Sequence, residues 1–158
     1  MLLQKNRVKC GQVASQVQKR SLLDLVRVAH TLNIISVVCD DQSVREPLMD
    51  MIIAAGCVAE LFRSADEFLS SKSDIRTSCL IADMQLTSAS GLDLYEQLIA
   101  SGKTIPTILL VAGPDDDNRA RALQAGVSQV LRKPFDKGEL LACIKSTFKD
   151  RKTIRGRP

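Results

Sequence analysis

Short apolar runs alternate with helix-like segments along this chain. Four apolar runs have the length and continuity of strands buried on both faces, as in parallel sheets; they span residues 34–39, 78–84, 105–111 and 127–131. A fifth run, 58–62, mixes apolar and polar residues, as expected of a strand at a sheet edge. Because strands and helices alternate five times, the pattern predicts an α/β fold with a right-handed, doubly wound parallel sheet.

Pairs of residues with capping-box spacing mark the expected helix starts. These pairs are Ser43 with Glu46, Ser64 with Glu67, and Asp136 with Glu139. Gly91 is expected to begin another helix, and Pro106 to open the fourth strand, where its missing N–H does least harm.

Acidic side chains follow two of the predicted buried strands. Asp83 ends the run 78–84, and the pair Asp40-Asp41 follows the run 34–39. If these strands are parallel neighbours, three carboxylates meet at the sheet edge where open α/β folds bind ligands. Their mutual repulsion calls for a cation, and an all-oxygen site suits Mg²⁺. An isolated Asp at this place would more simply open the following loop, so the other two carboxylates are what favour a site.

A lysine is predicted to reach the same edge from the last strand. Lys133-Pro134 follows the run 127–131. A lysine ammonium is a compact positive charge suited to binding a phosphate. The predicted edge therefore combines carboxylates with one cation.

Composition fits a single domain with an aliphatic core. The chain has 158 residues, of which 45% are hydrophobic and 3% aromatic. It has no apolar run long enough for a membrane span and no signal-peptide-like start, so we expect a cytoplasmic protein without membrane contact. Cys39 and Cys79 lie within predicted strands, and none of the five cysteines has Cys-x-x-Cys spacing. Reduced core thiols are therefore expected in preference to disulfides or zinc.

Positive charge gathers at the two ends of the chain. Residues 1–32 carry a net charge of +5 and residues 151–158 a net charge of +4, which leaves −5 on the remainder. We predict a basic extension over 1–32 with a short amphipathic helix near 21–31, a folded body over 33–150 and a basic tail over 151–158. The ends either bind an acidic surface, with a partner protein favoured and nucleic acid second, or are simply solvated.

The order of these features resembles the receiver domain of two-component response regulators. The resemblance covers about residues 33–150, and the segments 83–94 and 131–136 carry it most specifically. It implies a flavodoxin-like, three-layer sandwich with strand order 2-1-3-4-5 and five helices. It also implies a cis peptide bond between Lys133 and Pro134.

The resemblance assigns roles to the acidic edge. Asp83 would accept a phosphoryl group from a histidine kinase or a histidine phosphotransfer protein. Mg²⁺ would be held by Asp41, Asp83 and the backbone carbonyl of Gln85, and by Asp40 through water. Lys133 would bind the phosphoryl oxygens. Such a protein is a phosphoacceptor rather than an enzyme in the usual sense.

Three residues near the ends of the last two strands bear on the phosphoryl group and its readout. Ala112, the small residue usual in the family, is expected to bind the phosphoryl group together with Lys133. Val111 stands where the family usually has Ser or Thr, and Val130 where it usually has an aromatic residue. The acceptor pocket is thus predicted to be complete, whereas the parts that relay its state are atypical.

Two other functions remain open from the sequence. A receiver-like interaction module that no longer uses phosphorylation is favoured by Val111 and Val130 and opposed by the retained acids and Lys133. A phosphatase with an aspartate nucleophile would need an acid two residues after Asp83, and Gln85 cannot serve as one. Partners are expected to be a kinase or phosphotransfer protein and a downstream protein in preference to nucleic acid. The chain is expected to be a monomer or weak dimer.

Overall fold

The computed structural model describes residues 32–114 and 116–155, and side chains only as far as residue 149. The predicted helix near 21–31 lies outside the described residues, as do the basic side chains of both chain ends. From Asn33 onward, the described residues form one compact unit.

Five parallel strands form one sheet, in the order β2-β1-β3-β4-β5. The strands are β1 (Ile34–Val38), β2 (Val58–Phe62), β3 (Cys79–Asp83), β4 (Thr107–Ala112) and β5 (Gln129–Lys133). β3 is buried along its whole length, whereas β2 at one edge is half-buried, as its mixed composition predicted. The predicted strand order is confirmed.

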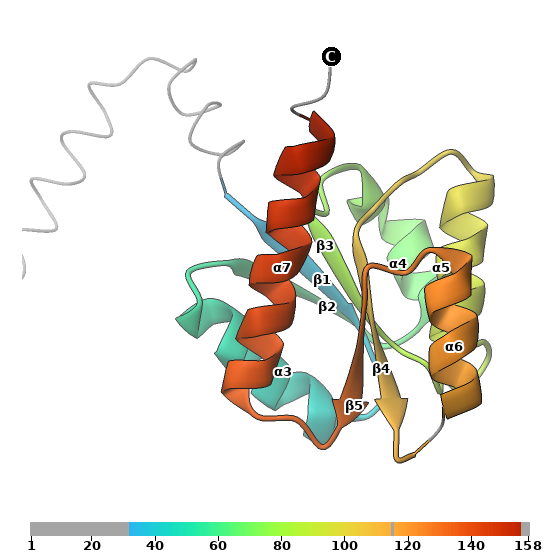
Figure 1. Ribbon diagram of the computed structural model, residues 1–158, viewed down its shortest axis with the longest axis horizontal. Coiled ribbons are helices and arrows are strands. Elements are labelled where there is room, and N and C mark those ends of the chain that lie inside the picture. The colour runs from blue at the N-terminus through green and yellow to red at the C-terminus, as the bar shows by residue number, and fades with distance from the viewer. Residues whose placement is uncertain (1–31, 115, 156–158) are drawn as a thin grey trace, which may run out of the picture. The chain divides into compact units, whose positions relative to one another are not determined.

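Helices cover both faces of the sheet (Figure 1). They are α3 (Gln42–Ala54), α4 (Ala65–Ser71), α5 (Gly91–Ala100), α6 (Asp116–Ala125) and α7 (Lys137–Arg155), with a 3₁₀ turn η1 (Ser73–Ile75) before β3. Buried side chains of α3 and α7 join one core cluster, and those of α4, α5 and α6 join the other. The three-layer sandwich is therefore confirmed over the described residues.

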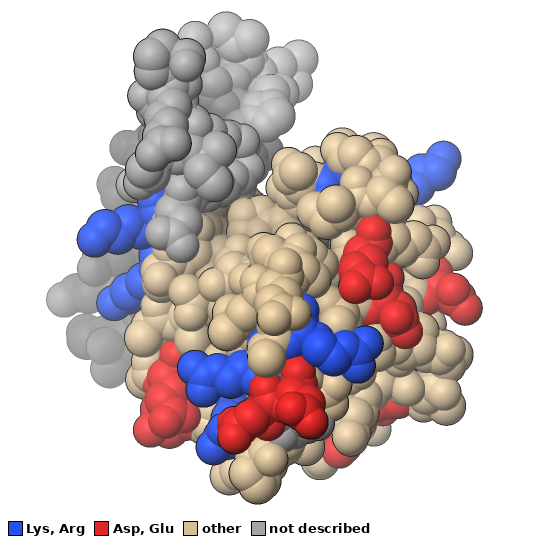
Figure 2. Space-filling model, turned by 45° about the vertical axis from the view of Figure 1, so that its right-hand side comes forward, with Lys and Arg blue, Asp and Glu red and all other residues tan. Residues whose placement is uncertain are grey.

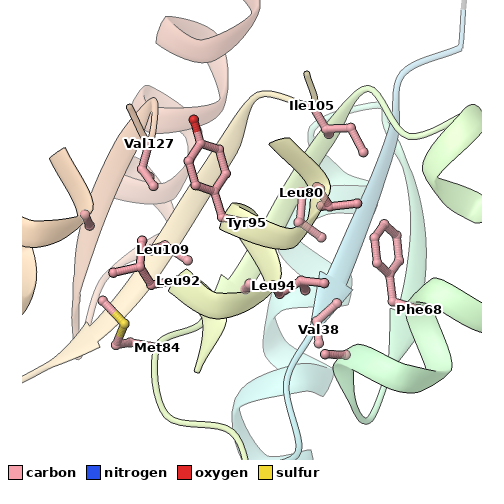
Figure 3. Close-up of a cluster of buried hydrophobic side chains, with 14 of the residues drawn as sticks. Val38, Phe68, Leu80, Met84, Leu92, Leu94, Tyr95, Ile105, Leu109 and Val127 are labelled. Carbon is pink, nitrogen blue, oxygen red and sulfur yellow. The ribbon is translucent and has the colours of Figure 1, made fainter. Parts of the chain in front are cut away.

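The core is aliphatic, as the composition predicted. Figure 3 shows the cluster on the α4-α5-α6 side, where Tyr95 and Phe68 lie among Leu and Val side chains. Phe68 is fully buried, and its ring meets that of Phe62 edge-on at a centroid distance of 5.3 Å.

Two strands begin later than the apolar pattern predicted. β4 starts at Thr107 rather than 105, after Pro106, whose carbonyl accepts a bond from the Leu80 N–H. β5 starts at Gln129 rather than 127, because Gly126 turns the chain with φ +99° and the Val127 N–H bonds back to the Ala122 carbonyl. Ile105 and Val127, the apolar residues at these places, lie just before the strands and are buried in the core cluster.

One of the predicted capping boxes is wrong. Asp41, not Ser43, is the N-cap of α3, because Ser43 donates both its N–H and its hydroxyl to Asp41 Oδ1. Glu46 accepts from the Gln42 side chain instead. The pair Asp136 and Glu139 is reciprocal as predicted.

The capping at Ser64 is confirmed in part. Ser64 accepts the Glu67 N–H, while the Glu67 carboxylate bonds to the N–H of Arg63 rather than of Ser64.

Candidate functional site

Parallel pairing brings the predicted site residues to one end of the sheet. Val38 pairs with Ala82, so the acid pair after β1 lies beside Asp83 at the end of β3. Ala112 at the end of β4 pairs with Lys133 at the end of β5. Figure 1 shows the arrowheads of β4 and β5 at the same end of the molecule.

Asp83 is a buried carboxylate that three other residues contact. Its residue surface is only 2% exposed. The Lys133 ammonium lies 2.8 Å from Oδ2, and the Gln85 N–H donates to Oδ1 at 3.0 Å. The Cys39 thiol donates to Oδ2 at 3.7 Å. These contacts fix the carboxylate at the strand end and offset its charge, which is what a positioned nucleophile requires.

The acid pair after β1 is more exposed and is held by hydroxyl groups. The bonds from Ser43 lower the pKa of Asp41, and the nearby positive charges of Lys133 and Arg45 lower it further. Asp40 accepts a hydrogen bond at Oδ2 from the hydroxyl of Thr87, which lies 47 residues away in the sequence. Asp41 is therefore ionised at neutral pH and lies within the field of the same lysine that pairs with Asp83.

Cys39 lies between the acid pair and the acceptor. Burial raises the pKa of its thiol, although a hydrogen bond to the Asp41 backbone acts in the opposite direction, and the Asp83 charge adds to the rise. The thiol is thus neutral at physiological pH and serves as a donor rather than a nucleophile. Its position in a predicted buried strand indicated only a core residue.

Gly91 allows α5 to approach the acceptor strand. A Cβ built on Gly91 would lie 2.4 Å from the Asp83 carbonyl oxygen and 3.0 Å from a methyl carbon of Leu109. The start of α5 therefore packs directly on the backbone of Asp83, in a space that only glycine fits. From sequence this glycine indicated no more than a helix start.

The oxygen donors available at this edge suit Mg²⁺. Ser43 engages Oδ1 of Asp41, which leaves Oδ2 for a metal, and the loop carrying the Gln85 carbonyl is fixed by a backbone bridge between Gln85 and Ser90. Within residues 32–114 and 116–155, no three His, Cys, Asp or Glu side chains are grouped as metal ligands. The resemblance implies a smaller set, in which two carboxylates and one backbone carbonyl contact the metal directly. Contacts within the protein alone do not test this set, so the magnesium site stays a prediction.

The two atypical positions lie where the resemblance placed them. Val111 is 3% exposed on β4, next to the exposed Ala112 at the strand end. Val130 on β5 is half-buried against the core cluster that also contains Tyr95. The end of β4 thus presents a methyl group where a hydroxyl is usual. The cis Lys133–Pro134 bond is confirmed.

The surface around this end mixes both signs of charge. Figure 2 shows Lys and Arg side chains beside Asp and Glu side chains at the lower end of the displayed face. An ion pair joins Arg132 on β5 to Asp116 at the start of α6 at 3.5 Å, with both side chains at least half exposed.

Comparisons with known proteins agree with this geometry. The family model "Response regulator receiver domain" matches residues 35–145. The response regulator protein TodT of Pseudomonas putida is 33% identical over 139 residues, which is 88% of this chain and 59% of TodT. Nodulation protein W of Bradyrhizobium diazoefficiens is 38% identical over 125 residues, which is 78% of this chain and 55% of that protein.

Solved structures give the same result. The response regulator StyR is 34% identical with a TM-score of 0.70, covering 79% of this chain and 65% of the StyR chain. The structure titled FixJ-N is 26% identical with a TM-score of 0.69, covering 74% of this chain and 94% of that chain.

This chain belongs to the response regulator receiver domain family, the signal-receiving module of two-component systems. It spans between half and three fifths of the length of the curated relatives described above. No helix within the described residues is long and apolar enough to cross a membrane.

Proposed function

We propose that this receiver domain accepts a phosphoryl group on Asp83 from a histidine kinase or a histidine phosphotransfer protein, and signals through protein contacts. The observation that carries the proposal is the ion pair between Asp83 Oδ2 and Lys133 Nζ, at 2.8 Å and at the end of the sheet. In this family that arrangement unites a nucleophile with a cation for the phosphoryl oxygens.

The proposed step is the attack of an Asp83 carboxylate oxygen on the phosphorus atom. The bond between phosphorus and the donor's imidazole nitrogen breaks, and its electron pair stays on that nitrogen. Such transfers depend on positioning and charge neutralisation more than on covalent chemistry by the protein. Asp41, Asp83 and the Gln85 carbonyl would hold Mg²⁺, with Asp40 acting through water, and Mg²⁺ supplies positive charge to the phosphoryl oxygens when bound.

The chain's own residues prepare this step in three ways. Gln85 and Lys133 engage different oxygens of Asp83 and so orient the carboxylate. Lys133 is 23% exposed, so its ammonium can face both Asp83 and an incoming phosphoryl group. Ala112 beside it is small enough to admit that group close to the backbone.

The donor would approach past an apolar cavity that adjoins Lys133. This cavity has a volume of about 470 Å³ and lies between α3 and the segment after β5. Its lining includes Val44, Pro47, Met51 and Phe135. A donor that reaches Asp83 must pass over the side chains that line this cavity. We therefore assign the contact surface for the donor to the cavity lining.

A direct test is phosphorylation by a small phosphodonor, acetyl phosphate, read by intact mass. With Mg²⁺ present, the protein should gain the mass of one phosphoryl group, and EDTA should prevent the gain. Asp83→Asn is the matched control and should gain nothing. A gain that survives Asp83→Asn would contradict the assignment.

The second candidate is an interaction module that works without phosphorylation. Val111 and Val130 favour it, because the hydroxyl and the aromatic ring that usually relay the phosphorylated state are both missing. The same measurement separates the two functions, since a module of this kind would show no gain in mass under any of these conditions.

A further inference from the structure

The loop between β3 and α5 is tied to both groups of carboxylates at the site. At its start, the Gln85 N–H donates to Asp83 Oδ1. Two residues later, the Thr87 hydroxyl donates to Asp40 Oδ2, on the segment that follows β1. The loop thus bridges two strand ends that are far apart in the sequence.

We propose that Thr87 is a positioning residue for the metal site, a role that rests on the proposed function. The Gln85 carbonyl and the carboxylates of the acid pair come from different segments, and a metal ion needs them in one place. The bond between Thr87 and Asp40 joins these segments directly. It therefore orders the ligands before the metal binds.

The chemistry of the bond is compatible with a bound metal. A carboxylate has two oxygens and about four lone-pair sites, so donation to Oδ2 leaves Oδ1 of Asp40 to orient a metal-bound water. Thr87 is neutral and adds no positive charge to oppose the cation. Its β-branched side chain has few rotamers, so holding the hydroxyl in place costs little entropy.

The benefit is one of preorganisation. Without the bond, the exposed loop and Asp40 would have to be ordered when the metal binds, and that cost would weaken affinity. The structure also gives Asp41 an equivalent tie through Ser43, so both members of the acid pair are held by hydroxyls of their own chain. The two ties differ, since Ser43 belongs to the segment that follows Asp41, whereas Thr87 connects the acid pair to the loop of Gln85.

The test is a Mg²⁺ titration of the full chain, followed by amide chemical shifts, in the parent and in Thr87→Val. Valine keeps the shape and removes the donor. We expect the dissociation constant to rise about fivefold, less than the roughly tenfold or more expected of a buried hydrogen bond to a charged group, because this bond is exposed. Thr87→Ser should restore the parent affinity. Thr104→Val, an exposed change at the opposite end of the sheet, is the matched control and should leave the affinity unchanged.

A second readout needs no metal. In EDTA, the amides of residues 85–90 should exchange faster in Thr87→Val than in the parent, with the midpoint of thermal unfolding unchanged. Parent affinity for Mg²⁺ in Thr87→Val, or tighter binding, would overturn the role of Thr87 and leave the proposed function standing. A parent that binds no Mg²⁺ would overturn both.

Discussion

Substitution of Gly91 by alanine tests whether the start of α5 positions the phosphoacceptor. The new Cβ would lie 2.4 Å from the carbonyl oxygen of Asp83 and 3.0 Å from its carbonyl carbon. Close C–H contacts to a carbonyl oxygen have C···O separations of about 3.3 Å or more, so helix and strand must part by roughly 0.9 Å. The nearest atoms are backbone, which cannot rotate away as a side chain can.

Two terms set the expected size of the effect. Overpacking of this kind costs about 1–3 kcal/mol, and alanine regains at most about 1 kcal/mol of helix propensity over glycine. We expect the free energy of unfolding to fall by about 1–2 kcal/mol. A displacement near 1 Å at a reacting group can cost on the order of 100-fold in rate, which sets the upper limit for slower phosphorylation of Asp83.

The assay combines urea unfolding with the rate of phosphorylation by acetyl phosphate. Gly138→Ala is the matched control in the first turn of α7, because its Cβ would meet only the Asp136 carboxylate tip, at 3.2 Å. We expect that control to change stability by less than about 0.5 kcal/mol. If Gly91→Ala has the same urea midpoint of unfolding and the same phosphorylation rate as the parent, the close packing of α5 on Asp83 contributes to neither stability nor phosphorylation.

Three other substitutions test the end of β4, the Cys39 thiol and the ion pair between Asp74 and Lys103. Val111→Thr restores a hydroxyl at the end of β4, so a phosphoryl mimic should shift the amides around Val130 more in this variant than in the parent; equal shifts would show that the valine does not weaken the switch. Burial raises the pKa of Cys39 above 9.0, so the folded state holds the thiol proton more tightly than the unfolded chain does. The stability this provides is complete below the pKa of the unfolded thiol and is lost as the pH rises through the higher pKa of the folded state, so in urea unfolding the parent should lose stability relative to Cys39→Val as the pH rises above 9; a difference that does not vary with pH would contradict it. The side chain of Asp74 in η1 is 3% exposed and pairs with Lys103, so Asp74→Asn should lower the free energy of unfolding by about 1–3 kcal/mol. This is less than for a fully buried pair because the Lys103 side chain is about half exposed, and an unchanged urea midpoint would refute the prediction.

Most of the fold could be predicted because buried parallel strands leave a strong apolar pattern. The pattern failed at two strand starts, where Pro106 and Val127 are apolar but lie in the connections that precede the strands. It also failed at the start of α3, where Asp41 and Ser43 are both good N-caps and the sequence does not decide between them. The side-chain bonds to Asp41 settled that choice.

The candidate site was predictable only in part. Strand-end position and residue type were enough to bring Asp83 and Lys133 together. The contacts of Cys39 with Asp83 and of Thr87 with Asp40 join residues 44 and 47 positions apart, and no local pattern encodes them. The need for glycine at position 91 likewise arises from tertiary packing on β3.

The central claim is that Asp83, and no other carboxylate at this edge, accepts the phosphoryl group. An acyl phosphate can be reduced by borohydride, which converts the modified aspartate to homoserine and records its position. After treatment with acetyl phosphate and Mg²⁺, followed by reduction and peptide mass spectrometry, we predict homoserine at position 83 and aspartate at positions 40 and 41. Homoserine at 40 or 41, or at none of the three positions, would contradict the account.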